Sequence, residues 1–283
     1  MLIDRFESME SYFASPYVAG VSERLRIEYK ILERGDAGLH AYCWACARSE
    51  QLEINPVRTS YGLQWREALR CPRCMLTARK RFGLHLLAES MQPGAPPPYL
   101  TEQVSYSFVA ARRHWPKLVA SEFLPTKAQR ILQTQKIKFL TRNIFIKARH
   151  EDLTALTLRD ASIGGMLSMD VLEHIADTKA VLREARRVLV PGAPFVITAP
   201  FLNGSQVTSV RAVHEADGSI RHLLEPEYHR DPLDPAGVLC YYHFGWDLLD
   251  ELRTAGFARA EIVFPWDPHF GYLSEQTAFL AFA

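Results

Sequence analysis

Two hydrophobic patterns alternate along most of the chain. Short apolar runs, which are typical of buried strands, lie at about residues 98–101, 117–122, 166–169 and 195–199. Between and after these runs, apolar residues recur every three or four positions, which predicts helices over about residues 104–115, 178–189 and 247–255. The alternation predicts an α/β fold, in which helices cover both faces of a mainly parallel sheet. Ligands of such sheets bind at the carboxyl ends of the strands.

The region before residue 96 follows a different pattern. Mixed spacings of three and four predict helices over about residues 7–33 and 77–91. The proline-rich stretch 93–98 can be neither helix nor central strand, because proline fixes φ and lacks an N–H donor. We therefore predict a small N-terminal region over residues 1–95 and a main domain over residues 96–283.

Four of the five cysteines form two close pairs in this N-terminal region. Cys43 and Cys46, like Cys71 and Cys74, are separated by two residues, so each pair can direct two thiolates to one point. Four thiolates complete the tetrahedral site that Zn²⁺ prefers and leave no open coordination position. The spacing predicts a zinc ribbon over about residues 40–76 with a structural metal, the alternatives being unliganded or redox-active cysteines. The isolated Cys240 is interpreted as a core or pocket-wall residue.

Composition and charge narrow the classes of partner and compartment. The apolar fraction of 48% and the charged fraction of 23% are ordinary for a globular protein. A net charge of +1 and a pI of about 7.7 argue against a dedicated nucleic-acid binder. The sequence has neither a signal-like N-terminus nor an apolar run long enough for a membrane span. Together with paired cysteines that suit a reducing compartment, these features predict a cytoplasmic protein. They do not decide between a monomer and a homo-oligomer.

The most specific motif occupies residues 168–193. It runs from a strand through Asp-Val-Leu-Glu-His to a helix, and ends in Arg-Val-Leu-Val-Pro-Gly-Ala before another strand and Pro200. This order resembles the segment after the fourth strand of class I S-adenosylmethionine (SAM)-dependent methyltransferases, where Pro-Gly-Gly replaces the Pro-Gly-Ala that ends here at Ala193. The resemblance implies a Rossmann-like class I methyltransferase sheet, SAM as cofactor and a methyl-transfer activity.

The resemblance also implies which residues hold SAM. Glu122 matches the acidic residue that ends the second strand and binds the ribose hydroxyls, and Asp152 matches the one that receives the adenine amino group. The family's first glycine-rich loop is missing, because residues 100–105 contain no glycine. Side chains must then hold the methionine moiety. The predicted SAM site comprises Glu102, Gln103, Ser105, Glu122, Phe123, Asp152, Leu153, Ser168, Asp170 and His174.

The glycine-less first motif and the four-cysteine ribbon together resemble a less common, type 11-like branch of these enzymes. In the class I fold, the segment after the fifth strand commonly builds the acceptor pocket, and here that segment is the polar and aromatic insert of about residues 203–245. A histidine near its free pKa of about 6.5 can accept a proton from an acceptor. The residues predicted to act directly are Tyr228, His222, His229 and His243, and ordinary packing or hydrogen bonding is the alternative for each.

The leading functional hypothesis is O- or N-methylation of a small-molecule acceptor. One alternative is an RNA or protein methyltransferase that binds its substrate through basic residues of the ribbon, namely Arg66, Arg70, Arg73, Arg79, Lys80 and Arg81. Another, suggested by the unusual residues 101–103, is a cyclase or lyase that attacks the aminobutyryl chain of SAM and releases methylthioadenosine. The last is a scaffold that no longer binds SAM. S-adenosylhomocysteine as product identifies methyl transfer.

Overall fold

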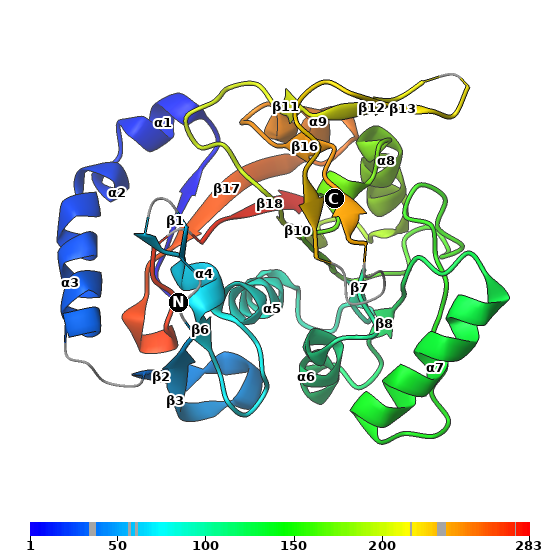
Figure 1. Ribbon diagram of the computed structural model, residues 1–283, viewed down its shortest axis with the longest axis horizontal. Coiled ribbons are helices and arrows are strands. Elements are labelled where there is room, and N and C mark those ends of the chain that lie inside the picture. The colour runs from blue at the N-terminus through cyan, green and yellow to red at the C-terminus, as the bar shows by residue number, and fades with distance from the viewer. Residues whose placement is uncertain (34–37, 56–57, 60–61, 216, 231–235, 275) are drawn as a thin grey trace.

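The computed structural model describes the chain except for residues 34–37, 56–57, 60–61, 216, 231–235 and 275. Among the described residues, seven strands form a central sheet in the order β1-β17-β18-β10-β9-β7-β8 (Figure 1). Their bounds are β1 (Ile3–Phe6), β7 (Tyr99–Leu100), β8 (Val119–Ala120), β9 (Met166–Met169), β10 (Pro194–Thr198), β17 (Arg259–Pro265) and β18 (Ala278–Phe282). This arrangement confirms the predicted α/β fold, in which helices cover a mainly parallel sheet.

The directions of the strands locate a ligand crevice. Strands β8, β7, β9 and β10 are parallel, whereas β18 is antiparallel to both β10 and β17. The chain leaves β7 for β8 on one side, and β9 later pairs with the other side of β7. Strand order therefore reverses at β7, and ligands of such sheets bind beyond the carboxyl ends at the reversal.

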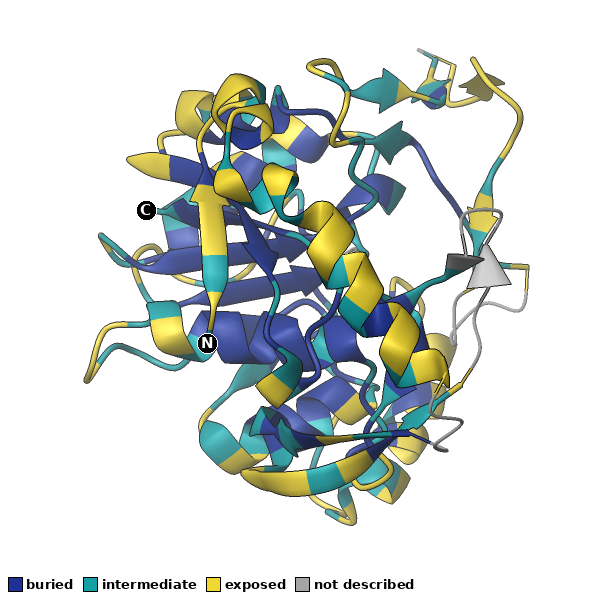
Figure 2. Cartoon of the chain, turned by 90° about the vertical axis from the view of Figure 1, so that its left-hand side faces the viewer, coloured by how far each residue is buried: buried dark blue, intermediate teal, exposed yellow. Residues whose placement is uncertain are grey.

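Helices cover both faces of the sheet, and the strands between them are mostly buried (Figure 2). One face is covered by α5 (Ala78–Ser90), α6 (Tyr106–His114) and α7 (Lys127–Thr141). The other is covered by α1 (Met9–Phe13), α8 (Thr178–Val188) and α9 (Leu248–Thr254). No helix among the described residues has the length and apolar character to cross a membrane.

Most predicted elements are confirmed within a few residues. The predicted helix over residues 7–33 is instead divided into α1, α2 (Pro16–Ala19) and α3 (Val21–Glu33). Ser15 accepts a hydrogen bond from the Val18 N–H and so caps the new helix that Pro16 begins. Helix α3 lies at the edge of the molecule, where the buried Glu28 carboxylate accepts hydrogen bonds from Trp266 and Ser274 (Figure 1).

The residues before the proline-rich stretch share the core of the residues after it. Strand β1 extends the central sheet by pairing with β17, and α5 lies against β9 and β10. The ribbon consists of β2 (Gly38–Cys43), η1 (Trp44–Cys46), β3 (Arg48–Ile54), β4 (Arg58–Thr59), β5 (Gly62–Leu63), α4 (Trp65–Ala68) and β6 (Leu69–Arg70). Its buried residues belong to the same hydrophobic cluster as α5 and the sheet. The ribbon is therefore a cover of the sheet and has no separate core.

The insert after β10 folds into short strand pairs that lie near α8 and α9 (Figure 1). The pairs are β11 (Ser209–Val210) with β16 (Tyr242–His243), β12 (Ala212–His214) with β13 (Ile220–His222), and β14 (Tyr228–His229) with β15 (Val238–Leu239). The insert is fixed to η2 (Leu172–His174), the turn that follows β9. Leu239 O accepts from His174 Nδ1 at 2.8 Å, and Tyr241 N donates to Glu173 O at 2.8 Å.

Candidate functional site

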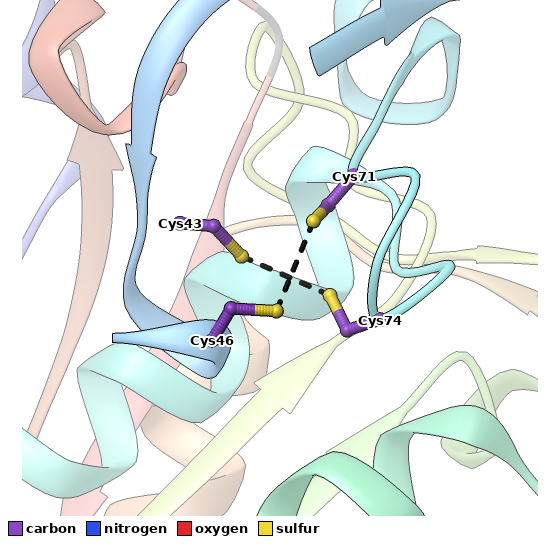
Figure 3. A group of neighbouring side chains, drawn as sticks. All are labelled: Cys43, Cys46, Cys71 and Cys74. Atoms are coloured by element: carbon purple, nitrogen blue, oxygen red, sulfur yellow. Dashed lines mark hydrogen bonds between the residues drawn. The ribbon is translucent and has the colours of Figure 1, made fainter. Parts of the chain in front are cut away.

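The four paired cysteines converge on one point (Figure 3). The sulfur atoms of Cys43 and Cys74 are 3.8 Å apart, and those of Cys46 and Cys71 are 3.9 Å apart. A disulfide needs about 2.05 Å between sulfurs, so these thiols are not bonded to each other. A tetrahedral ion with Zn–S bonds of about 2.3 Å places its sulfurs roughly 3.8 Å apart, which is the spacing observed. The geometry of the cluster therefore fits zinc.

The backbone supports the same interpretation. In each cysteine pair, the residue after the second cysteine has a left-handed conformation, with φ of 54° at Ala47 and 62° at Met75. Such a conformation costs a residue with a Cβ roughly 1–2 kcal/mol. Its recurrence in both turns indicates that the turns are shaped to direct two thiolates inward. A metal bound there would stabilise the turns and the cover that they place over α5.

Glu122 lies just beyond β8, at the predicted ribose position. Its Oε1 accepts hydrogen bonds from Gln103 N at 2.8 Å and from Val104 N at 2.7 Å. The carboxylate is thereby held against the loop that replaces the family's glycine-rich turn. These two backbone N–H groups orient the Glu122 side chain at the edge of the sheet where β7 and β8 end.

Two predicted SAM residues in this loop have structural bonds. The buried Gln103 side chain donates to Lys147 O at 3.1 Å and accepts from Arg149 N at 2.7 Å, so it joins the loop to residues 147–149. Ser105 Oγ accepts from Phe108 N and caps α6. These bonds shape the loop without glycine, and a SAM contact of either side chain remains a prediction.

The predicted adenine end lies across from Glu122. Asp152 Oδ1 accepts from the N–H and the hydroxyl of Thr154, which fixes the carboxylate in a turn. The Phe123 ring is 62% exposed, and its centroid is 5.6 Å from that of His150 in an edge-to-face contact. An exposed aromatic ring suits contact with a flat heterocycle. Leu153 is buried beneath this region.

Asp170 ends β9 in a left-handed conformation with φ of 51°. Its Oδ2 lies 2.7 Å from a guanidinium nitrogen of Arg79, and its Oδ1 accepts from Thr198 Oγ1 at 3.0 Å. Burial alone would raise the pKa of Asp170, but the charges of Arg79 and Arg66 outweigh it and hold the pKa below its usual range. Asp170 is therefore a carboxylate that is already neutralised by α4 and α5.

The remaining acidic residue of this edge, Glu102, also faces α5. Its Oε2 is 3.4 Å from Lys80 Nζ, and its Oε1 is buried without a hydrogen-bond partner among the described residues. Ser168 is buried in β9 and accepts from Thr101 Oγ1 at 3.3 Å, which ties β9 to the end of β7. The carboxyl ends of β7 and β9, where the methionine moiety of SAM is predicted to bind, thus carry both acidic and basic side chains.

Two of the four predicted catalytic residues come together in the insert. Glu227 Oε1 accepts from His229 Nε2 at 2.8 Å and from His243 Nε2 at 3.1 Å, and the Cys240 thiol adjoins both rings. His222 and Tyr228 are exposed on the insert and do not join this group. His174, predicted as a SAM residue, instead packs edge-to-face on His229, with ring centroids 4.9 Å apart.

The neighbours of His229 shift its pKa. Interaction with the Cys240 thiol, and then with Glu173 and Glu227, raises the pKa of His229 to about 11, although burial lowers it. These neighbours favour a positive charge on the ring when no ion is bound. This group of side chains therefore attracts positive charge.

Sequence reasoning missed several residues of the site. Arg66, Arg79 and Lys80 were grouped as an exposed basic stripe, yet they pair with acidic residues at the carboxyl edge. Glu173 lies next to His174 in the motif but was not singled out, and Glu227 and Cys240 were assigned no chemistry. The signal for Glu173 was present, since it is an ionisable residue beside a histidine in a turn that follows a buried strand.

Comparisons with known proteins found one matching family model and a number of similar solved structures. Residues 107–197 match the model of a methyltransferase domain family. Among solved structures, a SAM-dependent methyltransferase from Mesorhizobium loti is 16% identical, with a TM-score of 0.48 over 73% of this chain and 98% of that chain. A SAM-dependent methyltransferase from Thermotoga maritima is 15% identical, with a TM-score of 0.39 over 71% of this chain and 88% of that chain.

A phosphoethanolamine N-methyltransferase from Haemonchus contortus is 12% identical, with a TM-score of 0.39 over 63% of this chain and 37% of that chain. A search of curated proteins found no match.

The cysteine cluster predicts a measurable metal dependence. Cys71→Ser should lower the zinc content of the purified protein by one equivalent per chain and lower its melting temperature, because structural zinc contributes directly to folding. Elemental analysis and calorimetry measure the two effects. Ser49→Ala, an exposed change in the same hairpin, is the control and should alter neither. An unchanged zinc content in Cys71→Ser would contradict the assignment.

The Arg79–Asp170 pair predicts a pH-dependent stability. Arg79→Gln removes the nearer of the two cations that Asp170 and Glu67 share, the other being Arg66, and should lower the free energy of unfolding by about 3 kcal/mol at neutral pH. Because the pKa of Asp170 is lowered in the folded protein, the contribution of the pair is present above the ordinary carboxyl pKa of about 4 and is lost as pH falls below it.

Urea unfolding of both chains at neutral pH and below about pH 4 measures this difference, which should shrink at the lower pH. Arg73→Gln is the control, since Arg73 is half-exposed and its pair with Glu50 is worth at most about 1 kcal/mol. A difference that grows on acidification would disprove the role of Asp170.

Proposed function

We propose that this chain, which carries a class I SAM-dependent methyltransferase domain, methylates an oxygen or nitrogen of a small-molecule acceptor. The observation that supports this proposal most directly is the position of the insert. Leu239 and Tyr241 bind η2, and Tyr242 Oη donates to Ala176 O at 2.6 Å. The polar side chains of the insert are thereby held beside the turn that follows β9, at the edge where SAM binds in this fold.

The predicted contacts of SAM follow from the carboxyl edge. We assign the ribose to Glu122 and the adenine to the region of Asp152 and Phe123. The methionine moiety carries both an ammonium and a carboxylate. Glu102, whose Oε1 has no hydrogen-bond partner among the described residues, supplies the charge that complements the ammonium, in place of the backbone contacts of a glycine-rich loop.

Catalysis in this proposal comes mainly from positioning and desolvation. Methyl transfer is an in-line displacement in which the sulfonium leaves as a neutral thioether. Holding the acceptor atom close to the methyl carbon therefore supplies a large part of the rate enhancement.

The charge distribution disfavours an RNA or protein substrate on the ribbon. Arg70 pairs with Glu53 and Arg73 with Glu50, while the buried Arg81 donates to the carbonyl of Phe270. Arg66, Arg79 and Lys80 face acidic residues of the SAM edge, as described above. A row of cations that are already neutralised offers little to a polyanion. Cleavage of the aminobutyryl chain of SAM is the competing reaction. The identity of the nucleoside product distinguishes it from methyl transfer.

Product analysis tests the proposed reaction. The protein is incubated with SAM alone and with SAM plus the small-molecule fraction of a cell extract, and the nucleoside products are identified by mass spectrometry. S-adenosylhomocysteine that forms only with the extract is the expected result. Methylthioadenosine from SAM alone, above the spontaneous rate, would instead establish attack on the aminobutyryl chain.

Substitution of Glu122 tests the ribose assignment. Glu122→Gln should weaken SAM binding roughly 10- to 100-fold, since charge-assisted hydrogen bonds to the two hydroxyls are lost. Calorimetric titration measures the affinity, and circular dichroism checks that the loop held by Glu122 still folds. Glu33→Gln, an exposed change near the end of α3, should leave the affinity unchanged. Equal affinity of Glu122→Gln and the unaltered chain would exclude the assignment.

A further inference from the structure

A buried carboxylate without a hydrogen-bond partner lies beside two histidines at the turn after β9. Glu173 is fully buried, and among the described residues neither of its oxygens accepts a hydrogen bond. Its Oε1 lies 3.8 Å from His174 Nε2 and 3.7 Å from His229 Nδ1, beyond hydrogen-bonding distance. A buried carboxylate in this condition is costly, so a positive charge must lie beside it, either a protonated histidine ring or a bound cation.

The outer nitrogens of both rings are already engaged. His174 Nδ1 donates to Leu239 O at 2.8 Å, and because a carbonyl only accepts, the proton is on Nδ1. His229 Nε2 donates to the Glu227 carboxylate at 2.8 Å. In the neutral rings, both remaining nitrogens therefore present lone pairs toward Glu173 Oε1. Protein metal sites use this arrangement, in which an outer acceptor fixes the tautomer of each ligating histidine.

The spacing of the three inner atoms suits an ion. Glu173, His174 and His229 each offer one ligand atom, and these atoms all lie within 4.8 Å of one another. Bonds of about 2.1 Å to a tetrahedral or octahedral ion separate ligand atoms by roughly 3.0–3.4 Å. The distances from Glu173 Oε1 to the two histidine nitrogens, 3.8 and 3.7 Å, exceed this spacing by some tenths of an ångström.

We propose that Glu173, His174 and His229 bind a divalent transition metal, and that this ion holds the acceptor during methyl transfer. Two histidines and one carboxylate form the ligand set of sites that bind Zn²⁺ or Fe²⁺ and keep positions open for other ligands. The site is distinct from the four-cysteine cluster, whose sulfurs complete their own tetrahedron. Glu227, paired with His229, His243 and Arg211, acts as the outer carboxylate.

A neighbouring group of Glu227, Cys240 and His243 is the competing ligand set, since its atoms also lie within 4.8 Å of one another. Its carboxylate already accepts from two histidines and pairs with Arg211, and the Cys240 thiol donates to Tyr242 O at 3.3 Å. These groups are satisfied by protein atoms, whereas Glu173 is not. The observations therefore favour the Glu173 set.

The role in transfer rests on the proposed function and requires an acceptor whose reactive atom is a protic oxygen. On coordination, the acceptor loses its O–H proton to solvent, because the ion lowers the pKa of the bound group. A lone pair of that atom then forms the bond to the methyl carbon of SAM. The S–CH₃ bond breaks with its electron pair remaining on sulfur, which yields S-adenosylhomocysteine. No electron is gained or lost overall.

Metal content tests the site without reference to activity. The protein is loaded with Zn²⁺, freed of excess metal by gel filtration and analysed for metal per chain. Two equivalents are expected in the unaltered chain and one in Glu173→Gln, with the cysteine site retained. His229→Ala should also lose one equivalent, while His222→Ala, which removes an exposed histidine of the same insert, should keep both. Glu227→Gln should weaken binding roughly 10- to 100-fold.

Cobalt distinguishes the two ligand sets. With Zn²⁺ in the cysteine site and Co²⁺ in the second, a nitrogen and oxygen set gives weak visible bands, whereas coordination by Cys240 would add intense thiolate-to-metal charge transfer. Added 2-mercaptoethanol should then produce such a charge-transfer band if a position is open to an acceptor. A single metal equivalent in the unaltered chain, or loss of the second equivalent in Cys240→Ser but not in Glu173→Gln, would overturn the proposal.

The two proposals fail in different ways. If SAM binds in calorimetric titration but the second metal does not, the metal inference is wrong and the methyltransferase proposal stands. If the second metal binds but no S-adenosylhomocysteine forms with any extract fraction, the proposed reaction is wrong and the metal site stands. Thermal melts of Glu173→Gln and His229→Ala in the absence of metal separate loss of ligands from loss of fold.

Discussion

Helix α5 must be covered on two sides, and the architecture follows from that requirement. Most of its residues are buried, and Gly83 allows a close approach to β9, where an added Cβ would lie 3.2 Å from Met169 Sδ. The sheet covers one side of the helix. The other side is covered by the ribbon, whose short strands need the cysteine cluster to hold their turns. A metal bound at the cluster would therefore stabilise the sheet indirectly. It would hold the ribbon over α5, and neither the ribbon nor the sheet alone buries that helix.

The position of α5 also sets the electrostatics of the carboxyl edge. Its first turn places Arg79 against Asp170 and Lys80 near Glu102, so charges from the N-terminal region reach the predicted methionine end. The loop after β7 lacks the glycines that would bring backbone N–H groups close to a ligand. The side chains of Gln103 and Glu122 hold that loop in place through hydrogen bonds to its neighbours and to its backbone.

Local features could be read from the sequence, and distant pairings could not. The strand over residues 166–169 and the helix after it were predicted closely, because their apolar periodicity is strong and Pro191–Gly192 marks the stop. The cysteine spacing likewise predicted a converging cluster. By contrast, β1 reads as a polar segment, since an edge strand of four residues has little periodicity. Its pairing with β17 depends on residues far away in the chain.

The candidate site shows the same division. Family motifs located Glu122 and Asp152, but the meeting of Glu173 with His229 requires the insert to fold back on η2 through backbone bonds that no local pattern encodes. The pKa of His229 is likewise a product of that meeting, because it depends on Cys240, Glu173 and Glu227 together. The sequence therefore predicted histidines of the insert as candidate catalytic residues, but not the side chains that surround them.

The strand order has a consequence for how the polypeptide matures. Strand β18 lies between β10 and β17, and β1 pairs only with β17, so the two ends of the sheet are joined by a strand near residue 280. During synthesis, β1 and the ribbon emerge long before their partners, and the parallel strands wait with one edge unpaired. Contacts of such long range slow folding and expose aggregation-prone edges. The sheet therefore cannot close before β18 has been synthesised, and chaperone protection matters most until then.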